Sequence, residues 1–363
     1  MEKSFRMELA GRPLIVETGK MAKQASGAVL VRYGETVVLV TSTASKEARE
    51  GMDFFPLTVD YEEKMYAVGK MPGGFLRREG RPGNSAILNA RLIDRPIRPL
   101  FDKRCRNDIH VMATVLSVDY DNAPELCGML GASASLGISD IPWDGPIAGV
   151  RVGRIDGQFV INPTQEQLKV STLNITVAGS ETAILMVEGG AQEAPEEDVL
   201  DAIMFGHKTI KELVAFQKKI IEEVGKPKRT LIFPEIPEEI KTAIYAYAER
   251  PLKEAIFNPD KLTREAHMEE VRKEAEAHFK EIYPENGSDT AECLNHLTKE
   301  IVRHMISVDK IRPDGRALDE IRPISCEVGL LPRVHGSALF TRGQTQALTI
   351  RWHLCRKHRS LMI

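Results

Sequence analysis

Short segments rich in β-branched and aromatic residues recur through the first 190 residues and predict a strand-rich region. Residues 28–32 and 36–41 flank a Tyr33-Gly34-Glu35 turn, a pattern that predicts a β-hairpin. Further strands are predicted at residues 54–61, 109–118, 147–152, 158–161, 173–178 and 183–187.

Three other segments have helical spacing. Residues 85–95 predict a helix with one apolar face, formed by Ile87, Leu88, Leu92 and Ile93. Two prolines, Pro96 and Pro99, are expected to end or bend it. Residues 125–138 are small and apolar, which suits a helix packed closely on a sheet. Residues 196–224 carry a continuous apolar stripe and predict a long amphipathic helix.

The composition changes after residue 227, which we take as the end of a first domain, residues 1–227. Residues 228–237 are interrupted by prolines and predict a linker. Residues 238–309 are rich in Glu, Lys and Ala, have helical periodicity and predict an all-α domain. Breaks at residues 258–259 and 284–287 divide it into three helices.

Strand-like sequence returns near residue 310 and repeats the first hairpin. Three matches keep their order up to the hairpin turn: Glu17-Thr-Gly19 with Glu327-Val-Gly329, Gly27-Ala28 with Ser337-Ala338, and Arg32 with Arg342. After a one-residue gap at the turn, Gly34-Glu35-Thr36 matches Gly343-Gln344-Thr345 and Leu39 matches Leu348. Residues 310–350 are therefore predicted to begin a second, incomplete copy of the first domain. A sheet that lacks most of its strands cannot bury its apolar face.

The last residues, 351–363, form an aberrant basic tail. Residues 351–359 contain four basic residues and no acid, and apolar and polar positions do not alternate. The tail interrupts a strand that the repeat requires, so we interpret it as the product of a truncation or a shifted reading frame. The alternative is a basic RNA-binding tail.

The composition suits a soluble globular protein with its own core, since 42% of the residues are hydrophobic and 28% are charged. With the strands and helices predicted above, we expect the α+β fold class. The chain has no apolar run of about 18 residues and no signal-peptide pattern, so we expect a cytoplasmic protein with no membrane partner. The five cysteines form no CxxC pair and the nine histidines no HExxH pattern. A disulfide framework and a metal site are therefore not expected.

Charge is distributed unevenly along the chain. Residues 70–106 contain ten basic and three acidic residues, a local charge of +7, although the whole chain carries −3. A basic segment in an acidic protein indicates a localised site for an anion.

The first candidate site is the glycine-flanked segment of residues 73–82. We predict that Phe75 stacks on a base and that Arg77, Arg78 and Arg81 bind RNA, because the planar guanidinium group pairs with phosphate. The alternative is a solvated loop whose charge has no function.

A second cluster follows in the predicted helix. Arg91, Asp94, Arg95 and Arg98 are spaced three and four residues apart and share one helical face. We predict that the three arginines bind phosphate or the RNA backbone. The alternative is an Arg–Asp network on the surface.

Residues for catalysis are harder to find. Phosphoryl chemistry requires carboxylates that hold a metal ion, but Glu166 stands alone in its segment, and Asp53, Asp60 and Asp119 occur singly beside strands. We predict no metal-binding residue here, and a first domain that binds but does not catalyse. A small-molecule phosphate-transfer enzyme is a further alternative, which no P-loop or GxGxxG motif supports.

Long motifs of the chain resemble those of bacterial polynucleotide phosphorylase. They are DFFPLTV (53–59), FLRREGRP (75–82), RLIDRPIRPLF (91–101), FGH (205–207), RPDGR (312–316) and LPRVHGSALFTRG (331–343). The resemblance covers about residues 5–350. It implies two ribonuclease-PH-like domains, of the ribosomal protein S5 domain 2-like class, joined by a helical domain.

The resemblance also implies a function. Family members degrade single-stranded RNA from 3′ to 5′ by phosphorolysis, with inorganic phosphate as co-substrate and Mg²⁺ or Mn²⁺ as cofactor. They act as homotrimers, in some cases within an RNA-degradation complex. The loop that matches Phe75, Arg77, Arg78 and Arg81 lines the RNA entrance.

The family's catalytic residues belong to the second copy, beyond residue 350. In the first copy the position of its phosphate-holding serines is taken by residues 121–125. We therefore expect no catalytic residue in this chain and a function limited to RNA binding. The competing hypothesis is a non-catalytic RNA-binding or assembly subunit.

Overall fold

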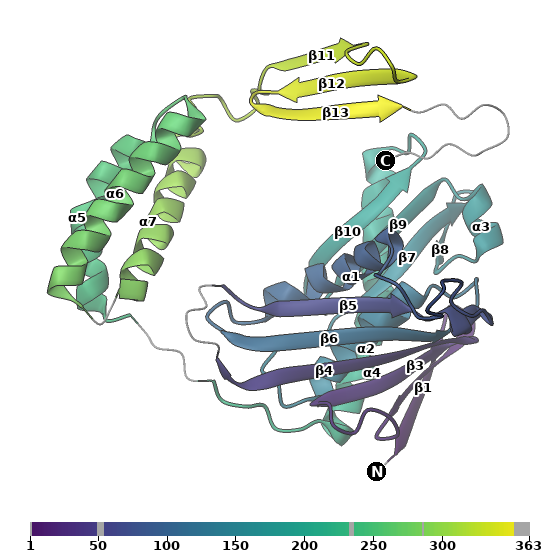
Figure 1. Cartoon of the computed structure of the whole chain (residues 1–363). Helices are drawn as coiled ribbons and strands as arrows, with labels where there is room; N and C mark the ends of the chain where they lie inside the picture. The colour runs from purple at the N-terminus through teal and green to yellow at the C-terminus, as the bar shows by residue number, and fades with distance from the viewer. Residues whose placement is uncertain (1, 49–53, 232–235, 285–286, 352–363) are drawn as a thin grey trace. The chain divides into compact units, whose positions relative to one another are not determined.

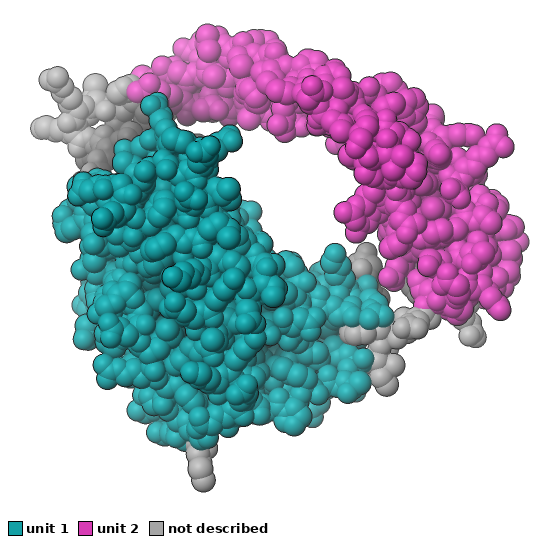
Figure 2. Space-filling view, turned by 180° about the vertical axis from the view of Figure 1, so that it is seen from behind, with its two compact units in different colours: residues 1–233 teal, residues 234–363 magenta. Residues whose placement is uncertain are grey.

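The computed structural model describes residues 2–48, 54–231, 236–284 and 287–351. The chain forms two compact units, residues 1–233 and residues 234–363, which Figure 2 shows in separate colours. Each unit has its own apolar core.

Unit 1 begins with a six-stranded sheet of order β1-β2-β3-β4-β6-β5 (Figure 1). Its strands are β1 (Lys3–Leu9), β2 (Arg12–Thr18), β3 (Gly27–Tyr33), β4 (Thr36–Ala48), β5 (Leu57–Glu63) and β6 (Asn107–Ser117). Neighbouring strands are antiparallel except β5 and β6, which are parallel. The predicted hairpin is β3–β4, and its turn contains Gly34 at φ +59°.

A second sheet of four antiparallel strands has the order β10-β9-β7-β8. Its strands are β7 (Ala148–Ile155), β8 (Gln158–Ile161), β9 (Leu173–Gly179) and β10 (Ile184–Ala191). The short helix α3 (Gln165–Val170) connects β8 to β9 and begins with a capping box between Thr164 and Gln167.

Helix α2 (Pro124–Ile138) packs against both sheets and against α4, and every residue from Leu126 onward is buried. Its small residues explain how it fits. A Cβ atom at Gly131 would lie 2.5 Å from Cγ2 of Val40 in β4, and one at Gly137 would lie 2.5 Å from Cδ1 of Ile221. The predicted close packing of this segment on a sheet is confirmed.

Helix α4 (Glu196–Val224) has the predicted bounds and covers the second sheet with its apolar stripe. Gly206 lies over that sheet, where a Cβ atom would be 2.9 Å from Val152. Farther along, the buried Gln217 side chain donates a hydrogen bond to the carbonyl of Ile147 (2.7 Å). This bond ties the helix to the segment that enters β7.

Helix α1 (Asn84–Ile97) follows the short 3-10 helix η1 (Met65–Val68) and ends in η2 (Arg98–Leu100). The predicted apolar face is wrong in part. Ile87 and Leu88 are exposed, whereas the buried side is formed by Ala86, Leu92, Ile93, Pro96 and Ile97. The buried face is the one that contacts β5 and α2. Pro96 lies inside the last turn of the helix, which ends at Ile97 and so stops close to the two prolines, as predicted.

The start of the predicted linker belongs to unit 1. The Lys228 ammonium donates to the carbonyls of Leu136, Gly137 and Ser139 at the C-terminal end of α2 (2.7–2.9 Å). Arg229 pairs with Asp140 (2.5 Å). These contacts anchor the segment after α4, so only later residues are available as a linker.

Unit 2 contains α5 (Glu238–Ile256), α6 (Lys261–Ile282) and α7 (Gly287–Ser307). They pack around a core that includes Ile244, Leu252, Phe279, Leu294 and Leu297. Helix α6 begins at Asp260, whose carboxylate accepts the amide of Thr263 (2.8 Å).

Three antiparallel strands follow: β11 (Ile324–Val328), β12 (Gly336–Arg342) and β13 (Thr345–Arg351). They correspond to β2, β3 and β4 of unit 1. Gly19 and Gly329 adopt φ +84° and +76°, and the turn glycines Gly34 and Gly343 adopt +59° and +61°. The repeat thus holds for backbone conformation as well as for sequence.

The strand registers correct the predicted alignment of the repeat. Gly27 pairs with Ser42 in unit 1, and Gly336 pairs with Arg351 in unit 2. Gly27 therefore corresponds to Gly336 and not to Ser337, and Tyr33 rather than Arg32 corresponds to Arg342. The one-residue gap lies in the connection before β12, because strand pairing requires a continuous register through the hairpin turn.

The same pairing moves the boundary of the predicted tail. Arg351 is the last residue of β13, so the regular sheet extends one residue beyond the predicted end at 350. The rest of the tail, residues 352–363, lies outside the described residues.

Candidate nucleic-acid interface

A long exposed loop, residues 69–83, connects η1 to α1, and we call it the arginine loop. Gly69 ends η1 in the left-handed conformation, at φ +69°. The side chain of Glu79 reaches back to accept the amide of Met65 (2.9 Å), which closes the base of the loop. The sequence analysis did not identify Glu79 as a structural residue.

The tip of this loop is a tight turn. The amide of Arg77 donates to the carbonyl of Gly74 (2.9 Å), so Phe75 and Leu76 occupy the two central positions. Phe75 is 101% exposed and Leu76 75%. Arg77 has φ +48°, a conformation uncommon for any residue with a side chain. The turn thus presents an aromatic ring entirely to solvent.

The three arginines of the loop are free to bind. The side chains of Arg77, Arg78 and Arg81 are exposed, and none pairs with a carboxylate among the described residues. Three unpaired guanidinium groups beside an exposed ring form the combination that binds single-stranded nucleic acid: cations for phosphates and an aromatic face for a base. The structure therefore places the four predicted residues in one loop.

The arginines of α1 are arranged differently. Arg98 binds the carboxylate of Asp94 (2.6 and 2.9 Å) and the carbonyl of Leu57 (3.0 Å). Arg95 pairs with Glu188 of β10. Only Arg91 is exposed with no side-chain partner among the described residues. Asp94 and Arg98 form one ion pair and Arg95 forms another with Glu188, which are the kind of contacts that the alternative interpretation describes. That the three arginines bind phosphate or the RNA backbone stays a prediction, and Arg91 is the one among them without a side-chain partner in the described part of the chain.

The segment that matches the family's serine position, residues 121–125, is filled by side chains of unit 1. The guanidinium of Arg12 donates to Oδ1 of Asn122 (2.9 Å). Glu125 pairs with Arg151 (2.6 Å), and both side chains are largely buried. Arg12 was not identified from the sequence, because one arginine at the start of a strand carries no motif. Asn122 and Glu125 of this segment are thus engaged with arginines of unit 1.

Asp119 holds the turn before this segment. Partial burial alone would raise the pKa of Asp119, but hydrogen bonds from the amides of Asp121 and Glu35 and from Asn122 outweigh it, and the pKa is lowered. The carboxylate is therefore charged and engaged in the turn.

The described residues contain neither a metal-binding cluster nor a membrane-spanning helix. No group of three or more His, Cys, Asp or Glu side chains in residues 2–351, apart from the gaps, could hold a metal ion. Across the same residues, no helix combines the length and the apolar character that crossing a membrane requires.

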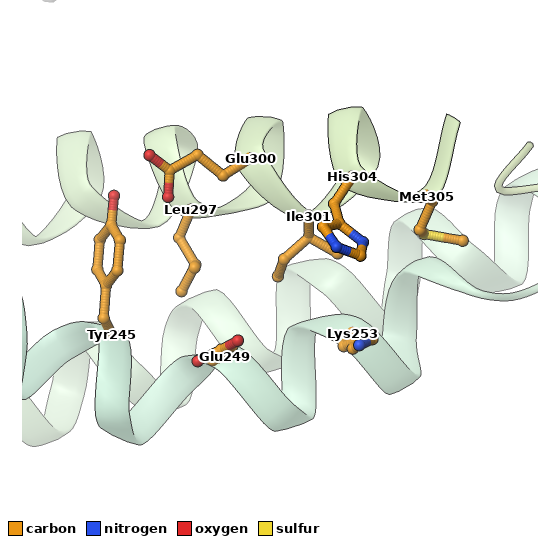
Figure 3. A pocket seen from close by; sticks show the side chains of 8 residues that line it. All are labelled: Tyr245, Glu249, Lys253, Leu297, Glu300, Ile301, His304 and Met305. Carbon is orange, nitrogen blue, oxygen red and sulfur yellow. The ribbon is translucent and has the colours of Figure 1, made fainter. Parts of the chain in front are cut away.

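A groove of about 270 Å³ lies between α5 and α7 in unit 2 (Figure 3). Tyr245, Glu249 and Lys253 line it from α5, and the facing residues of α7 are Leu297, Glu300, Ile301, His304 and Met305. Burial is the main cause that raises the pKa of Tyr245 to about 12. Acidic and basic side chains are mixed here, so the groove has no preference for an anion.

Comparison with known proteins identifies the fold class. Residues 10–142 match the family described as "3′ exoribonuclease family, domain 1", and residues 145–209 match its domain 2. Unit 1 is therefore a ribonuclease-PH-like α+β domain, as predicted. Residues 239–317 match "Polyribonucleotide nucleotidyltransferase, RNA binding domain", which covers the three helices of unit 2.

Curated relatives narrow the class to one family. The relative from Heliobacterium modesticaldum, named polyribonucleotide nucleotidyltransferase, is 59% identical over 95% of this chain and 49% of its own length. The relative of the same name from Syntrophomonas wolfei is 58% identical over 96% of this chain and 50% of its own length. The relative in Geobacillus kaustophilus is 56% identical over 95% and 48%. The chain belongs to the polyribonucleotide nucleotidyltransferase family, which confirms the resemblance seen in its motifs. It spans about half the length of these relatives.

A solved structure of rice (Oryza sativa) Rrp46 aligns with 61% of this chain and 94% of its own, at 14% identity and a TM-score of 0.46. That score is below the level at which a shared fold would follow from the alignment.

Proposed function

We propose that the chain takes part in 3′-to-5′ phosphorolytic degradation of single-stranded RNA, and that unit 1 contributes RNA binding through the arginine loop. The observation that carries the proposal is the turn at Gly74–Arg77. It exposes Phe75 completely, and the same loop carries three exposed arginines that pair with no carboxylate among the described residues. Burying a base against the ring and pairing phosphates with the guanidinium groups would stabilise a bound strand.

The family's reaction transfers the terminal nucleotide of RNA to inorganic phosphate. An oxygen of inorganic phosphate forms a bond to the last phosphorus, the bond from that phosphorus to the 3′ oxygen breaks, and a nucleoside diphosphate leaves. The shortened RNA gains a proton on its new 3′ hydroxyl. We assign to Phe75, Arg77, Arg78 and Arg81 the task of holding the strand, and no bond-making step.

The intact family enzyme is expected to use Mg²⁺ or Mn²⁺. The described residues do not fit such an ion, because no cluster of carboxylate, imidazole or thiolate groups is present among them. We therefore assign the metal to none of the described residues. Arg12 and Arg151 engage Asn122 and Glu125 of the segment 121–125, which supports a role for unit 1 other than catalysis.

The test uses the full chain with poly(A), inorganic phosphate and Mg²⁺, and measures ADP release together with binding of labelled oligo(A). We expect binding without ADP release. Phosphate-dependent ADP release at a rate proportional to protein concentration would contradict the limitation to binding. Absence of binding at low salt would contradict the role of the arginine loop.

The proposal also includes a cytoplasmic location, a homotrimer and association with an RNA-degradation complex, as the family resemblance implies. Light scattering behind size-exclusion chromatography would measure the mass of the purified chain. A mass three times 40.5 kDa is expected for the trimer, and a mass of one chain would contradict it.

A further inference from the structure

Unit 2 contains a basic cavity of about 540 Å³, which is separate from the arginine loop and from the arginines of α1 in unit 1. Three segments line it: the first turn of α6, the loop before β11, and the turn between β12 and β13. The lining side chains include five cations, Lys261, Arg264, Arg316, Arg322 and Arg342. A cavity of this size is in the range that holds a nucleotide-sized ligand.

The charges of the cavity are not balanced. Asp314 is the one acidic residue in the lining, against the five cations. Outside the lining, Glu265 approaches Lys261 at 3.7 Å, and both side chains are well exposed. Exposed pairs of this kind contribute little. Positive charges gathered in a concave surface concentrate their field and attract anions.

Two of the cations hold the cavity in shape. Arg316 and Arg322 both bind Asp314, at 2.9 and 3.4 Å. Gly343 allows this arrangement, because it has φ +61° and a Cβ atom there would lie 3.0 Å from Cδ of Arg322. Its amide also donates to the carbonyl of Pro323 (2.9 Å), which joins the β12–β13 turn to the loop.

The remaining cations are available to a ligand. Lys261 and Arg264 are one helical turn apart, so they lie on the same side of α6. Arg264 also donates to the backbone carbonyl of Asn258, which leaves other donors of its guanidinium group unused. The side chain of Arg342 has no hydrogen-bond or ion-pair partner among the described residues. Three cations thus border the cavity with unused donors.

We propose that this cavity binds phosphate groups through Lys261, Arg264 and Arg342. Guanidinium groups pair with phosphate oxygens in a bidentate manner. A phosphodiester chain or a diphosphate carries more negative charge and more acceptor oxygens than a single carboxylate, so it interacts more strongly with several cations at once. The phosphate comes from the backbone of bound RNA or from a free phosphate or nucleotide. Where RNA is the source, the inference rests on the function proposed above and adds a second contact to it.

The experiment compares two charge-matched variants of the full chain. The cavity variant is R264E/R342E, which leaves Asp314, Arg316 and Arg322 intact. The control is R250E/K273E, because both residues are exposed on α5 and α6, outside the cavity lining, and the net charge changes equally. Circular dichroism and thermal unfolding check that both variants keep their fold.

Binding is measured by fluorescence anisotropy with labelled oligo(A), and by calorimetry with inorganic phosphate and with ADP. If RNA is the source, the cavity variant loses at least about fivefold more affinity for oligo(A) than the control, and its salt slope falls by about 1.4, at about 0.7 for each lost phosphate contact. If the source is free phosphate, the cavity variant loses affinity for phosphate or ADP while oligo(A) binding matches the control. Either result supports the site.

Equal affinities of the cavity and control variants for all three probes would overturn the inference. The variant R77A/R78A/R81A separates this failure from that of the proposed function. If it weakens oligo(A) binding while the cavity variant matches the control with all three probes, the inference fails and the arginine loop stands. If the cavity variant matches the control with all three probes and R77A/R78A/R81A also leaves oligo(A) binding unchanged, both fail.

Discussion

Replacing the three arginines of the arginine loop by alanine tests the proposal that this loop binds RNA. In R77A/R78A/R81A the backbone turn remains, because the bond from the amide of residue 77 to Gly74 and the Glu79–Met65 contact do not use the arginine side chains. The side chains are exposed and unpaired among the described residues, so their removal opens no cavity in the core. The variant should fold normally.

The size of the effect follows from counterion release. Each phosphate contact to a single strand contributes about 0.7 to the slope of log affinity against log salt, so three contacts contribute about 2.1. Between 50 and 200 mM salt, the wild-type chain should therefore lose roughly 18-fold more affinity for oligo(A) than the variant does. Fluorescence anisotropy titrations at four salt concentrations measure both slopes.

The control removes the same charge elsewhere in unit 1. Lys208, Lys211 and Lys219 are exposed on α4, and K208A/K211A/K219A should leave the slope almost unchanged. A triple-arginine variant with the wild-type slope, or a control that lowers the slope equally, would refute the reasoning. Phe75→Ala should weaken binding by about 1–3 kcal/mol without changing the slope, since stacking releases no counterions.

Two further predictions concern the stability of unit 1. Gly131→Val should lower the free energy of unfolding by about 1–3 kcal/mol through overpacking, because a Cβ atom there would lie 2.5 Å from Val40. Gly73→Val, at a position with open space around it, should not lower it. Equal effects of the two substitutions in urea titrations would contradict the packing of α2. Burial lowers the pKa of Lys228 to about 8, below its unfolded value of 10.5. The unfolded chain therefore binds this proton more tightly, and the free energy of unfolding should rise as the pH increases from 8 towards 10.5. Lys228→Met should remove that rise, and an identical pH profile in urea titrations of both proteins would count against it.

Much of the fold follows from local patterns. Helix α4 has the predicted bounds, because its apolar stripe continues over 29 residues and stops where the helix stops. The small residues of α2 also predict its place, since only a helix without large side chains approaches a sheet so closely. Likewise, the β2–β4 repeat was visible in the sequence as matched glycines and turn residues.

Other features depend on contacts between residues far apart in the chain. Spacing alone placed Ile87 and Leu88 on the buried face of α1, but β5 and α2 contact a different side of that helix. The gap in the repeat moved from the hairpin turn to the preceding connection, because strand pairing sets the register and sequence identity does not. Lys228 and Arg229 looked like linker residues until the end of α2 supplied their partners.

The candidate sites divide in the same way. The sequence by itself determined the family, the basic segment of residues 70–106 and the residues of the arginine loop, because these depend on residue type and order. Only the tertiary structure decided which cations are free. Arg95 and Arg98 are paired by Glu188 and Asp94, whereas the loop arginines and Arg342 have no such partner among the described residues. The spacing of Asp94 and Arg98, four residues apart, already indicated their pair, whereas Arg95 and Glu188 are 93 residues apart and meet because β10 packs against α1. A charge paired across two elements depends on what folds against it, and a one-dimensional pattern does not contain that information.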